Sequence, residues 1–511
     1  MLLLQLLSSY FLPFSLLLLF LFLCYSSFVN EKASKNQPPS PPRLPIIGNL
    51  HQIGYYRYRS LQNLSRKYGP LMLLRFGSAP VLVVSSAEAA REVMKTQDLS
   101  FASRPKLSIH RKLLYDTKDV LFAPYGEYWR QVRSICVVHL LSKKRVESFQ
   151  YVREEETAVL IQKIRKSCSS SSAVVNLTEL FMSLTNNVVC RIALGSKYSG
   201  DEEGGRKINE LLARIVELMG MNHLGDSIPW LGWINWVNGL DAKVDKVAKE
   251  MDEFLEGVVQ ERIERDKRQS HDCGEEGQDF LDILLEIQKD NIAGAPVHRD
   301  TVKALILDMF GAGIDTTFSA LEWTMAEIVK HPDVMKKLHN EAREVAKGKP
   351  DITESDLDKL HYLKAVIKES LRIHCPVPLL APRESIKDAN VMGYHIKAGT
   401  QVIINAWAIA RDPSYWEDPE EFRPERFMNP NSLDFRGQNF EYIPFGSGRR
   451  GCAGISFAMH INELVLAKLV NEFDFSLPGG AGGESMDMSD AIGITIKKKT
   501  PLVVVATPHF F

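Results

Sequence analysis

The most informative stretch of the chain is Pro444-Phe445-Gly446-Ser447-Gly448-Arg449-Arg450-Gly451-Cys452-Ala453-Gly454. Its glycines let the backbone turn tightly before Cys452 and bring N–H groups toward the sulfur. A helical pattern follows directly, and the start of a helix favours a thiolate, which is a soft, electron-rich metal ligand. The stretch therefore predicts that Cys452 binds a metal ion. A lone cysteine on a glycine-rich turn would instead indicate a buried structural residue.

Upstream, the longest regular segment runs from about residue 300 to residue 330, with no proline between Pro296 and Pro332. At ~1.5 Å per residue such a helix is about 45 Å long and traverses a whole domain. Its middle reads Ala312-Gly313-Ile314-Asp315-Thr316-Thr317. Gly weakens a helix and Thr can bond a carbonyl one turn back, so this choice is unusual. The small residues predict an opening in the helix surface beside an acid and a hydroxyl, although close helix packing also explains them.

Two shorter motifs complete the pattern. Glu369-Ser370-Leu371-Arg372 places Glu and Arg on one helix face, where they can pair. Pro424-Glu425-Arg426-Phe427 follows later in the chain. With the spacing F-x-x-G-x-R-x-C-x-G around Cys452, these motifs resemble the cytochrome P450 superfamily, specifically its microsomal plant type in the 71 clan. The resemblance covers essentially the whole chain and implies a mainly α fold with smaller β-sheets (α+β).

The resemblance also implies the roles of individual residues. Cys452 would be the proximal ligand of the iron of heme b, in a loop that includes Phe445 and Gly454. Glu369, Arg372 and Arg426 would form a structural triad beneath that loop. The remaining heme-binding residues implied are Arg104, Trp129, Arg133, Ala312, Arg383 and Arg450. The arginines among them would lie near the two propionates, because buried carboxylates need charge-assisted donors; each arginine alone would more often lie at the surface.

The chemistry implied is that of a heme-thiolate monooxygenase. One oxygen atom from O2 enters a C–H or C=C bond of the substrate, and the other leaves as water. Thr316 would hold a water or hydroperoxide, and Asp315 would relay protons. Electrons would come from NADPH through a separate NADPH-cytochrome P450 reductase, with cytochrome b5 as a further partner, because the chain carries no flavin or nicotinamide fingerprint.

Two other functions stay open at this stage. Some relatives are dehydratases, lyases or isomerases, acting for example on an aldoxime without net oxygen insertion. Those that have lost oxygen activation often depart from the acid–threonine pair, which this chain keeps. A non-catalytic heme-binding protein is the third reading, and it leaves Asp315 and Thr316 unexplained.

The substrate is predicted only as a class. The resemblance places the pocket around residues 106–122, 210–240 and 491–494, the start of the long helix, and residues 377–380. The pocket residues predicted by name are Leu305, Met309, Val377, Leu380 and Ile492. They are mostly apolar, which suits a small lipophilic plant metabolite such as a terpenoid, a coumarin or phenylpropanoid, or an alkaloid.

The N-terminus predicts attachment to a membrane. Residues 2–29 contain no charged side chain, and a helix of that length spans about 42 Å against a hydrocarbon core of ~30 Å. A cleavable signal would carry a basic residue before a shorter apolar run. Here Lys32, Lys35 and Arg43 follow the run, which favours a cytosolic body. The sequence predicts an anchor (1–30), a Pro-rich hinge (31–50) and a heme-binding catalytic domain (51–511), single-pass in the endoplasmic reticulum membrane.

Composition excludes several other classes. The chain has 62 basic and 63 acidic residues, so no basic excess points to nucleic acid. Its seven cysteines include no CxxC pair, which argues against a structural zinc site and a disulfide framework. Segments 71–76 and 81–84 predict a β-hairpin, while the serines at 169–172 and the charged stretch 261–276 predict solvated loops. The tryptophan-rich segment 225–240 fits either a buried core or a stretch that dips into a bilayer.

Overall fold

A computed structural model describes residues 11, 13–20, 22, 36–168, 174–197, 203–268, 278–290, 297–347, 349, 351–429, 432–491 and 493–509. Most of the predicted N-terminal anchor, the serine run 169–172 and the predicted pocket residue Ile492 lie outside these residues.

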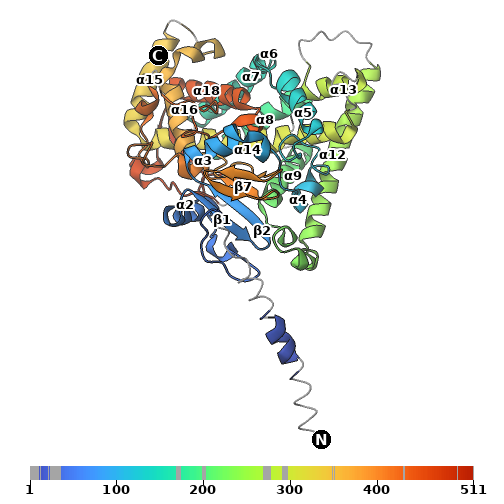
Figure 1. Ribbon diagram of the computed structural model, residues 1–511. Coiled ribbons are helices and arrows are strands. Elements are labelled where there is room, and N and C mark those ends of the chain that lie inside the picture. Colours follow the sequence, from blue (N-terminus) through green and yellow to red (C-terminus); the bar gives the residue numbers. More distant parts are fainter. Residues whose placement is uncertain are drawn as a thin grey trace, which may run out of the picture.

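Helices make up most of the body (Figure 1). They are α2 (Arg57–Tyr68), α3 (Ala87–Arg91), α4 (Ser108–Leu113), α5 (Glu127–Ser134), α6 (Lys143–Ser148), α7 (Gln150–Cys168), α8 (Leu177–Leu194), α9 (Glu203–Gly220), α10 (Leu224–Ser227), α11 (Trp233–Val237), α12 (Leu240–Arg268), α13 (Phe280–Asp290), α14 (Arg299–Lys330), α15 (Pro332–Ala346), α16 (His361–Ile373), α17 (Ala406–Ile409) and α18 (Ile455–Glu472). With the small sheets described next, this confirms the predicted mainly α class.

The strands form three small sheets. The first has the order β1-β2-β7-β4, the second β3-β9-β8, and the third pairs β5 with β6. Their bounds are β1 (Leu71–Phe76), β2 (Ala79–Val84), β3 (Val174–Asn176), β4 (Arg383–Glu384), β5 (Ala389–Val391), β6 (Tyr394–Ile396), β7 (Gln401–Ile404), β8 (Phe473–Ser476) and β9 (Val503–Pro508). The predicted hairpin is confirmed as antiparallel β1 and β2, and β2 pairs in parallel with β7. Distant parts of the chain thus share one sheet.

Helix α14 is the central element of the core. It was expected over residues 300–330 and spans Arg299–Lys330, and most of its side chains are buried. Helices α8, α16 and α18 pack against it. Among the described residues it is the one helix long and apolar enough to cross a membrane, but 72% of its most apolar stretch is buried. Its hydrophobicity therefore reflects its place inside the protein.

One loop prediction is wrong in part. The charged stretch 261–276 was expected to be a solvated loop, yet α12 continues as far as Arg268. Glu, Lys and Arg are good helix formers, so a high charge density does not end a helix. Arg262 is buried, pairs with Asp279 at 2.6 Å and with Asp282, and donates to the Leu194 carbonyl. Because Arg262 is buried in this ion pair, the helix continues into a region whose many charges had indicated a solvated loop.

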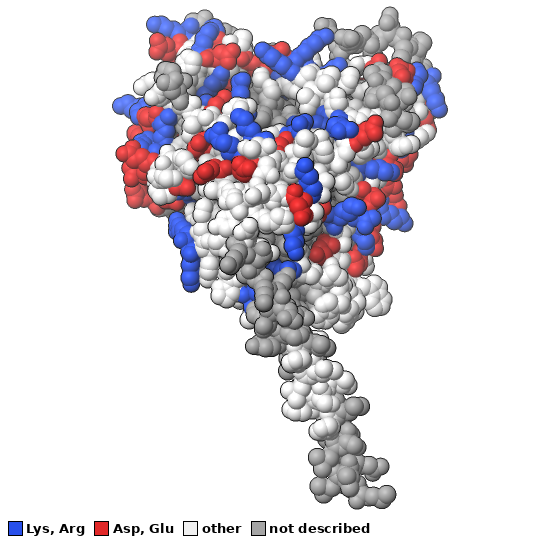
Figure 2. Space-filling model, in the orientation of Figure 1, with Lys and Arg blue, Asp and Glu red and all other residues white. Residues whose placement is uncertain are grey.

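The turn of the β1–β2 hairpin joins two segments that lie far apart in sequence. Gly77 N–H donates to the Ile47 carbonyl at 3.2 Å, and Ser78 N–H donates to the Ser227 carbonyl at 2.8 Å. The Pro-rich segment is held against the body from Pro39 onward, whose carbonyl accepts from Leu73 N–H. The Pro-rich segment and α10–α11 therefore meet at one end of the molecule, the lower end in Figure 1. Figure 2 shows a white, uncharged surface at the lower right of the body, with a few blue residues beside it.

Candidate active site

The loop before α18 holds the Cys452 side chain in a defined position. Cys452 N–H donates to the Phe445 carbonyl at 3.0 Å, and Gly454 N–H points at the sulfur with an N–Sγ distance of 3.3 Å. Gly448 has φ +70°, and a Cβ there would lie 2.2 Å from the Met94 carbonyl oxygen. The backbone can pass this point only because residue 448 has no side chain. The tight turn predicted before Cys452 is confirmed, but the N–H group at the sulfur comes from Gly454, after the cysteine.

The protonation of Cys452 differs from the expectation. Burial raises the pKa of the Cys452 thiol, while the Gly454 N–H bond and the Arg133 guanidinium lower it only in part. The helix start was expected to favour a thiolate, but α18 begins at Ile455, three positions further on. The loop by itself therefore favours the neutral thiol. A bound cation is needed to deprotonate it, as happens when a thiol coordinates a metal.

The middle of α14 opens as its small residues predicted. Ala312 is exposed, and Met309, Gly313 and Thr316 are partly exposed, within a helix that is otherwise mostly buried. The Cys452 side chain is exposed too, even though surrounding protein desolvates it. Helix α18, which follows this cysteine, packs against α14. From these exposures we infer that the turn and the sulfur border an internal space.

The acid and the hydroxyl beside the opening have different partners. Thr316 Oγ1 donates to the Ala312 carbonyl at 2.6 Å, the back-bond expected of a helical threonine. The buried Asp315 carboxylate accepts from Thr495 Oγ1 at 2.5 Å and forms an ion pair with Lys497. Thr495 and Lys497 belong to a C-terminal loop with no motif of its own, and sequence reasoning missed both. Their pairing with Asp315 depends only on tertiary contacts.

Three predicted heme-binding arginines form a buried cluster. Burial, with the charges of Arg383 and Arg450, holds the pKa of Arg104 well below its ordinary value. Burial and the neighbouring Arg383 lower the pKa of Arg450 to about 9. Asp98 lies 3.3 Å from Arg383, and Asp119 adds a second carboxylate nearby. Most of the remaining N–H groups donate to backbone carbonyls. Because these buried guanidinium groups repel one another, an anionic ligand bound between them would stabilise their charged forms.

Arg133 and Trp129, both on α5, connect this cluster to the cysteine loop. Arg133 Nη2 donates to the Gly451 carbonyl at 2.8 Å, next to Cys452. Trp129 Nε1 donates to the Val120 carbonyl at 3.0 Å, and the Arg450 guanidinium lies 4.2 Å from the centre of the Trp129 ring. The four-residue spacing of Trp129 and Arg133 on α5 thus places Arg133 beside the cysteine loop and Trp129 against the arginine cluster.

The predicted structural triad is brought together and buried. Arg372 binds both carboxylate oxygens of Glu369, with two N–O distances of 2.8 Å, and both side chains have no exposed surface. Arg426 Nε donates to the same carboxylate at 3.1 Å. Tyr442, two residues before the cysteine loop begins, donates to the Lys368 carbonyl at 2.6 Å. The triad and Tyr442 therefore fix α16 against two segments that precede the cysteine loop.

The predicted pocket residues do not all reach the internal space. Met309, Val377 and Leu380 are partly exposed. Leu380 lies next to the cysteine loop, since a Cβ at Gly446 would be 3.8 Å from its Cδ1. Leu305, in contrast, has no exposed surface and is part of the main hydrophobic core. The prediction that Leu305 lines the pocket is wrong for this structure, because its helix turn packs against neighbouring helices.

The chemistry of these groups fits one cofactor. A cysteine sulfur at one wall of an internal space, a helix opened by small residues, and buried cations without sufficient anionic partners suit an iron porphyrin bearing two carboxylates. The fold and the site therefore define a heme-thiolate protein.

Comparison with known proteins identifies the family. The family model "Cytochrome P450" matches residues 38–504. The chain is 57% identical to cytochrome P450 736A117 of Prunus mume over 98% of this chain and 96% of that protein. It is 54% identical to norfluorocurarine oxidase of a Strychnos species (96% of each chain) and 53% identical to (+)-menthofuran synthase of Mentha piperita (93% and 94%). A zebrafish cytochrome P450 solved with abiraterone superposes with a TM-score of 0.75 at 28% identity, covering 90% of this chain and 100% of that one.

The chain belongs to the cytochrome P450 family, in the plant type of the 71 clan. It is a cytochrome P450 monooxygenase, an oxidoreductase whose cofactor is heme with a thiolate ligand to the iron, and it takes electrons from NADPH through a reductase.

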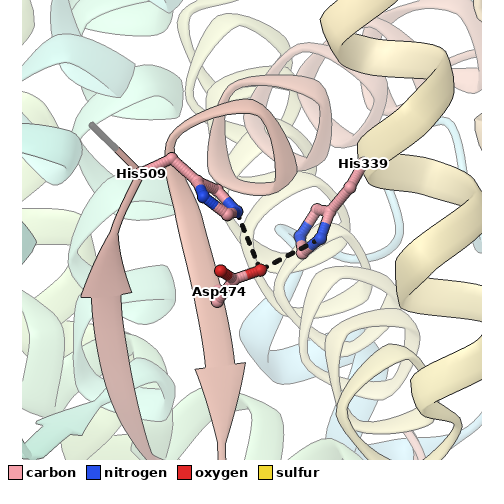
Figure 3. Close-up of side chains that lie close together, drawn as sticks. All are labelled: His339, Asp474 and His509. Carbon is pink, nitrogen blue, oxygen red and sulfur yellow. Dashed lines mark ion pairs between the residues drawn. The ribbon is translucent and has the colours of Figure 1, made fainter. Parts of the chain in front are cut away.

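A separate polar cluster lies away from this site. Figure 3 shows His339 of α15 and His509, after β9, on either side of Asp474 of β8, with N–O distances of 3.1 and 2.8 Å. Two histidines and a carboxylate resemble a metal site, but the Arg343 guanidinium contacts the same His509 nitrogen. A cation already lies at that nitrogen, so hydrogen bonds account for the cluster. It fastens the C-terminal strand to α15.

Proposed function

We propose that this cytochrome P450 inserts one oxygen atom into a small lipophilic plant specialised metabolite such as a terpenoid, a coumarin or phenylpropanoid, or an alkaloid. The observation that carries the proposal is the exposure of both the Cys452 sulfur and the opened turn of α14, with Thr316 at that turn. Plant relatives named for the oxidation of norfluorocurarine and the synthesis of menthofuran support the substrate class.

We propose the following roles for the residues around the space. Cys452 coordinates the iron, and Phe445 and Gly454 shape its loop. Ala312 leaves room for the heme on the α14 side. Residues proposed to hold the propionates are Arg104, Trp129, Arg133, Arg383 and Arg450. Glu369, Arg372 and Arg426 act from outside the site, by fixing the segment that precedes the cysteine loop.

When bound, the heme supplies the activation of O2. The residues of the chain then control where protons go. The Thr316 hydroxyl, already oriented by its bond to the Ala312 carbonyl, holds a water molecule beside the opened turn. Asp315 passes protons to this position, and its ion pair with the half-exposed Lys497 connects the buried carboxylate to the surface. Keeping this acid–hydroxyl pair favours oxygen insertion over dehydration.

The pocket residues support a small apolar substrate. Met309, Val377 and Leu380 offer apolar surface beside the cysteine loop and α14, which removes water from a lipophilic molecule and holds it near the reacting centre. Leu305 supports this wall from behind. Because one methylene changes binding by only about 1–3 kcal/mol, the site oxidised depends on the detailed shape of this wall.

The protein is also proposed to be a single-pass protein of the endoplasmic reticulum membrane, with anchor 1–30, hinge 31–50 and a cytosolic catalytic domain 51–511. The described residues at positions 14–20 include exposed phenylalanines and leucines. In addition, Trp230, Trp233 and Trp236 are 60, 61 and 77% exposed at the end of the body where the Pro-rich segment is held. Tryptophan favours the membrane interface. Of the two readings of segment 225–240, contact with the bilayer is therefore favoured over a buried core.

The test uses the full chain in microsomes with a plant reductase, with cytochrome b5 added in a parallel sample. A lipophilic plant extract is incubated under isotopically heavy oxygen, with and without NADPH, and analysed by mass spectrometry. Products that carry the label only with NADPH are expected, and the Cys452→Ala variant should form none. New products without label or NADPH would show a dehydratase or isomerase instead. Heme binding without any turnover would leave only the non-catalytic reading.

A further inference from the structure

Beside the exposed tryptophans is a cavity whose charge has not been explained. It has a volume of about 480 Å³ and opens to solvent between the start of α2 and the ends of α9 and α11. Its lining residues are Arg57, Gly220, Met221, Asn222, Asn238, Gly239, Leu240 and Lys243. It therefore has one apolar side, two side-chain amides and two cations, and belongs to none of the elements that carry the heme site.

Arg57 is the unusual member of this lining. In the part of the chain that the structure describes, no carboxylate lies within ion-pair distance of its guanidinium. Its side chain remains exposed at the mouth of the cavity, and partial burial lowers its pKa. Lys243, on the other wall, is already paired with Glu217 at 3.0 Å. The cavity therefore keeps one uncompensated positive charge, which an anionic group would balance.

The amides add donors suited to the same ligand. The Asn238 side-chain oxygen accepts from Leu240 N–H at 3.0 Å, so its amide nitrogen can donate to a ligand. Asn222 is exposed on the α9 side of the cavity. A guanidinium and neighbouring amide N–H groups are the donors that bind phosphate oxygens.

The position of the cavity indicates where the phosphate comes from. Asn238 directly follows Val237, which is 63% exposed and continues the apolar surface formed by Trp230, Trp233 and Trp236. If those tryptophans lie at the membrane interface, Arg57 lies at the depth of the lipid headgroups, where each basic side chain attracts anionic lipid. A free phosphate ion would gain nothing from the apolar side of the cavity.

We propose that this cavity binds the phosphate headgroup of an anionic phospholipid, with Arg57 as its cation and the Asn222 and Asn238 amides as additional donors. The site rests on the proposed contact between the tryptophan surface and the bilayer. It fixes how the body leans on the membrane, because it ties α2 and the α11–α12 junction to the lipid surface next to the hinge.

The test uses the full heme-loaded chain in a neutral detergent. It is titrated with dihexanoylphosphatidic acid, dihexanoylphosphatidylcholine and inorganic phosphate, and binding is followed by calorimetry. The phosphatidic acid is expected to bind at least about fivefold more tightly than the phosphatidylcholine, the effect of one basic side chain at a lipid surface. Arg57→Gln should remove this preference. Arg66→Gln, an equal loss of charge at the exposed far end of the same helix, should keep it.

Two results would overturn the proposal. An equal preference for phosphatidic acid over phosphatidylcholine in the Arg57→Gln and Arg66→Gln variants would show that Arg57 is not the cation that binds the phosphate. Inorganic phosphate that binds as tightly as the phosphatidic acid would show a site for the free ion. The underlying membrane contact is tested separately, through quenching of tryptophan fluorescence by brominated phosphatidylcholine in nanodiscs. That quenching should persist in Arg57→Gln and fall when Trp230, Trp233 and Trp236 are replaced by Phe. Its absence in the unmodified protein would refute the membrane contact alone.

Discussion

Glu369→Gln is the sharpest test of how this fold supports its cysteine loop. The carboxylate has no exposed surface and accepts from three groups on Arg372 and Arg426 as well as from Arg423 N–H at 2.9 Å. Glutamine keeps one acceptor oxygen, but it removes the negative charge and turns an NH2 group toward a guanidinium. Two largely buried arginines then lose their anionic partner.

The cost follows from breaking a buried ion pair from one side, which is about 3–5 kcal/mol. With an unfolding entropy of ~2.1 cal/mol/K per residue, a chain of this size loses roughly 1 °C in Tm for each kcal/mol. The variant should therefore unfold about 3–5 °C below the unmodified protein. It should also retain less heme, because the Arg426 segment and Tyr442, which are fixed against α16, lead into the cysteine loop.

The matched control is Glu417→Gln. Glu417 pairs with Arg423 at 2.8 Å, but its side chain is 81% exposed. Such surface pairs contribute ~0–1 kcal/mol, so its Tm should change by no more than about 1 °C. Both variants are followed by circular dichroism and by the heme absorption band at one fixed heating rate, because large proteins often unfold irreversibly. A Glu369→Gln variant that matches Glu417→Gln in Tm and heme content would refute the reasoning.

Three further predictions concern Cys452, Thr316 and the buried His110 of α4. Cys452→Ala should lose the thiolate-type spectrum of the carbon monoxide complex, and a variant that kept this spectrum would exclude Cys452 as the iron ligand. Thr316→Ala should still bind heme but release peroxide and consume NADPH without forming product; unchanged coupling of NADPH to product would make Thr316 a packing residue. Burial lowers the pKa of His110 from 6.5 to about 4. The folded state therefore binds fewer protons than the unfolded state between these pH values. A contribution of about 3 kcal/mol to the free energy of unfolding is present above pH 6.5 and is lost as the pH falls toward 4. Between these pH values, urea unfolding should show a smaller loss of unfolding free energy in His110→Phe than in the unmodified protein. The exposed control His361→Gln should lose as much as the unmodified protein.

Local signals in the sequence were sufficient wherever the structure depends on neighbouring residues. The glycines before Cys452 predicted a tight turn, and Gly448 indeed passes where a Cβ would meet the Met94 carbonyl. The spacing of Glu369 and Arg372 predicted a pair on one helix face. The small residues around Ala312 predicted an opened helix. Each of these features is decided by backbone geometry over a few residues, which the sequence states directly.

Long-range packing decided the rest. Nothing near Lys497 or Thr495 in the chain indicates that they bind the Asp315 carboxylate, and the charges around Arg262 suggested solvent instead of a buried pair. The raised pKa of the Cys452 thiol also departs from the local expectation, because desolvation by burial outweighs the nearby N–H group.

By itself, the sequence therefore determined the family and its heme-thiolate cofactor, since these reside in short motifs with fixed spacing. Only the tertiary structure decided which charges are buried, which pocket side chains reach the internal space, and that the tryptophans and Arg57 share one end of the molecule. Desolvation and contacts between distant segments are properties of the folded chain and leave no local pattern.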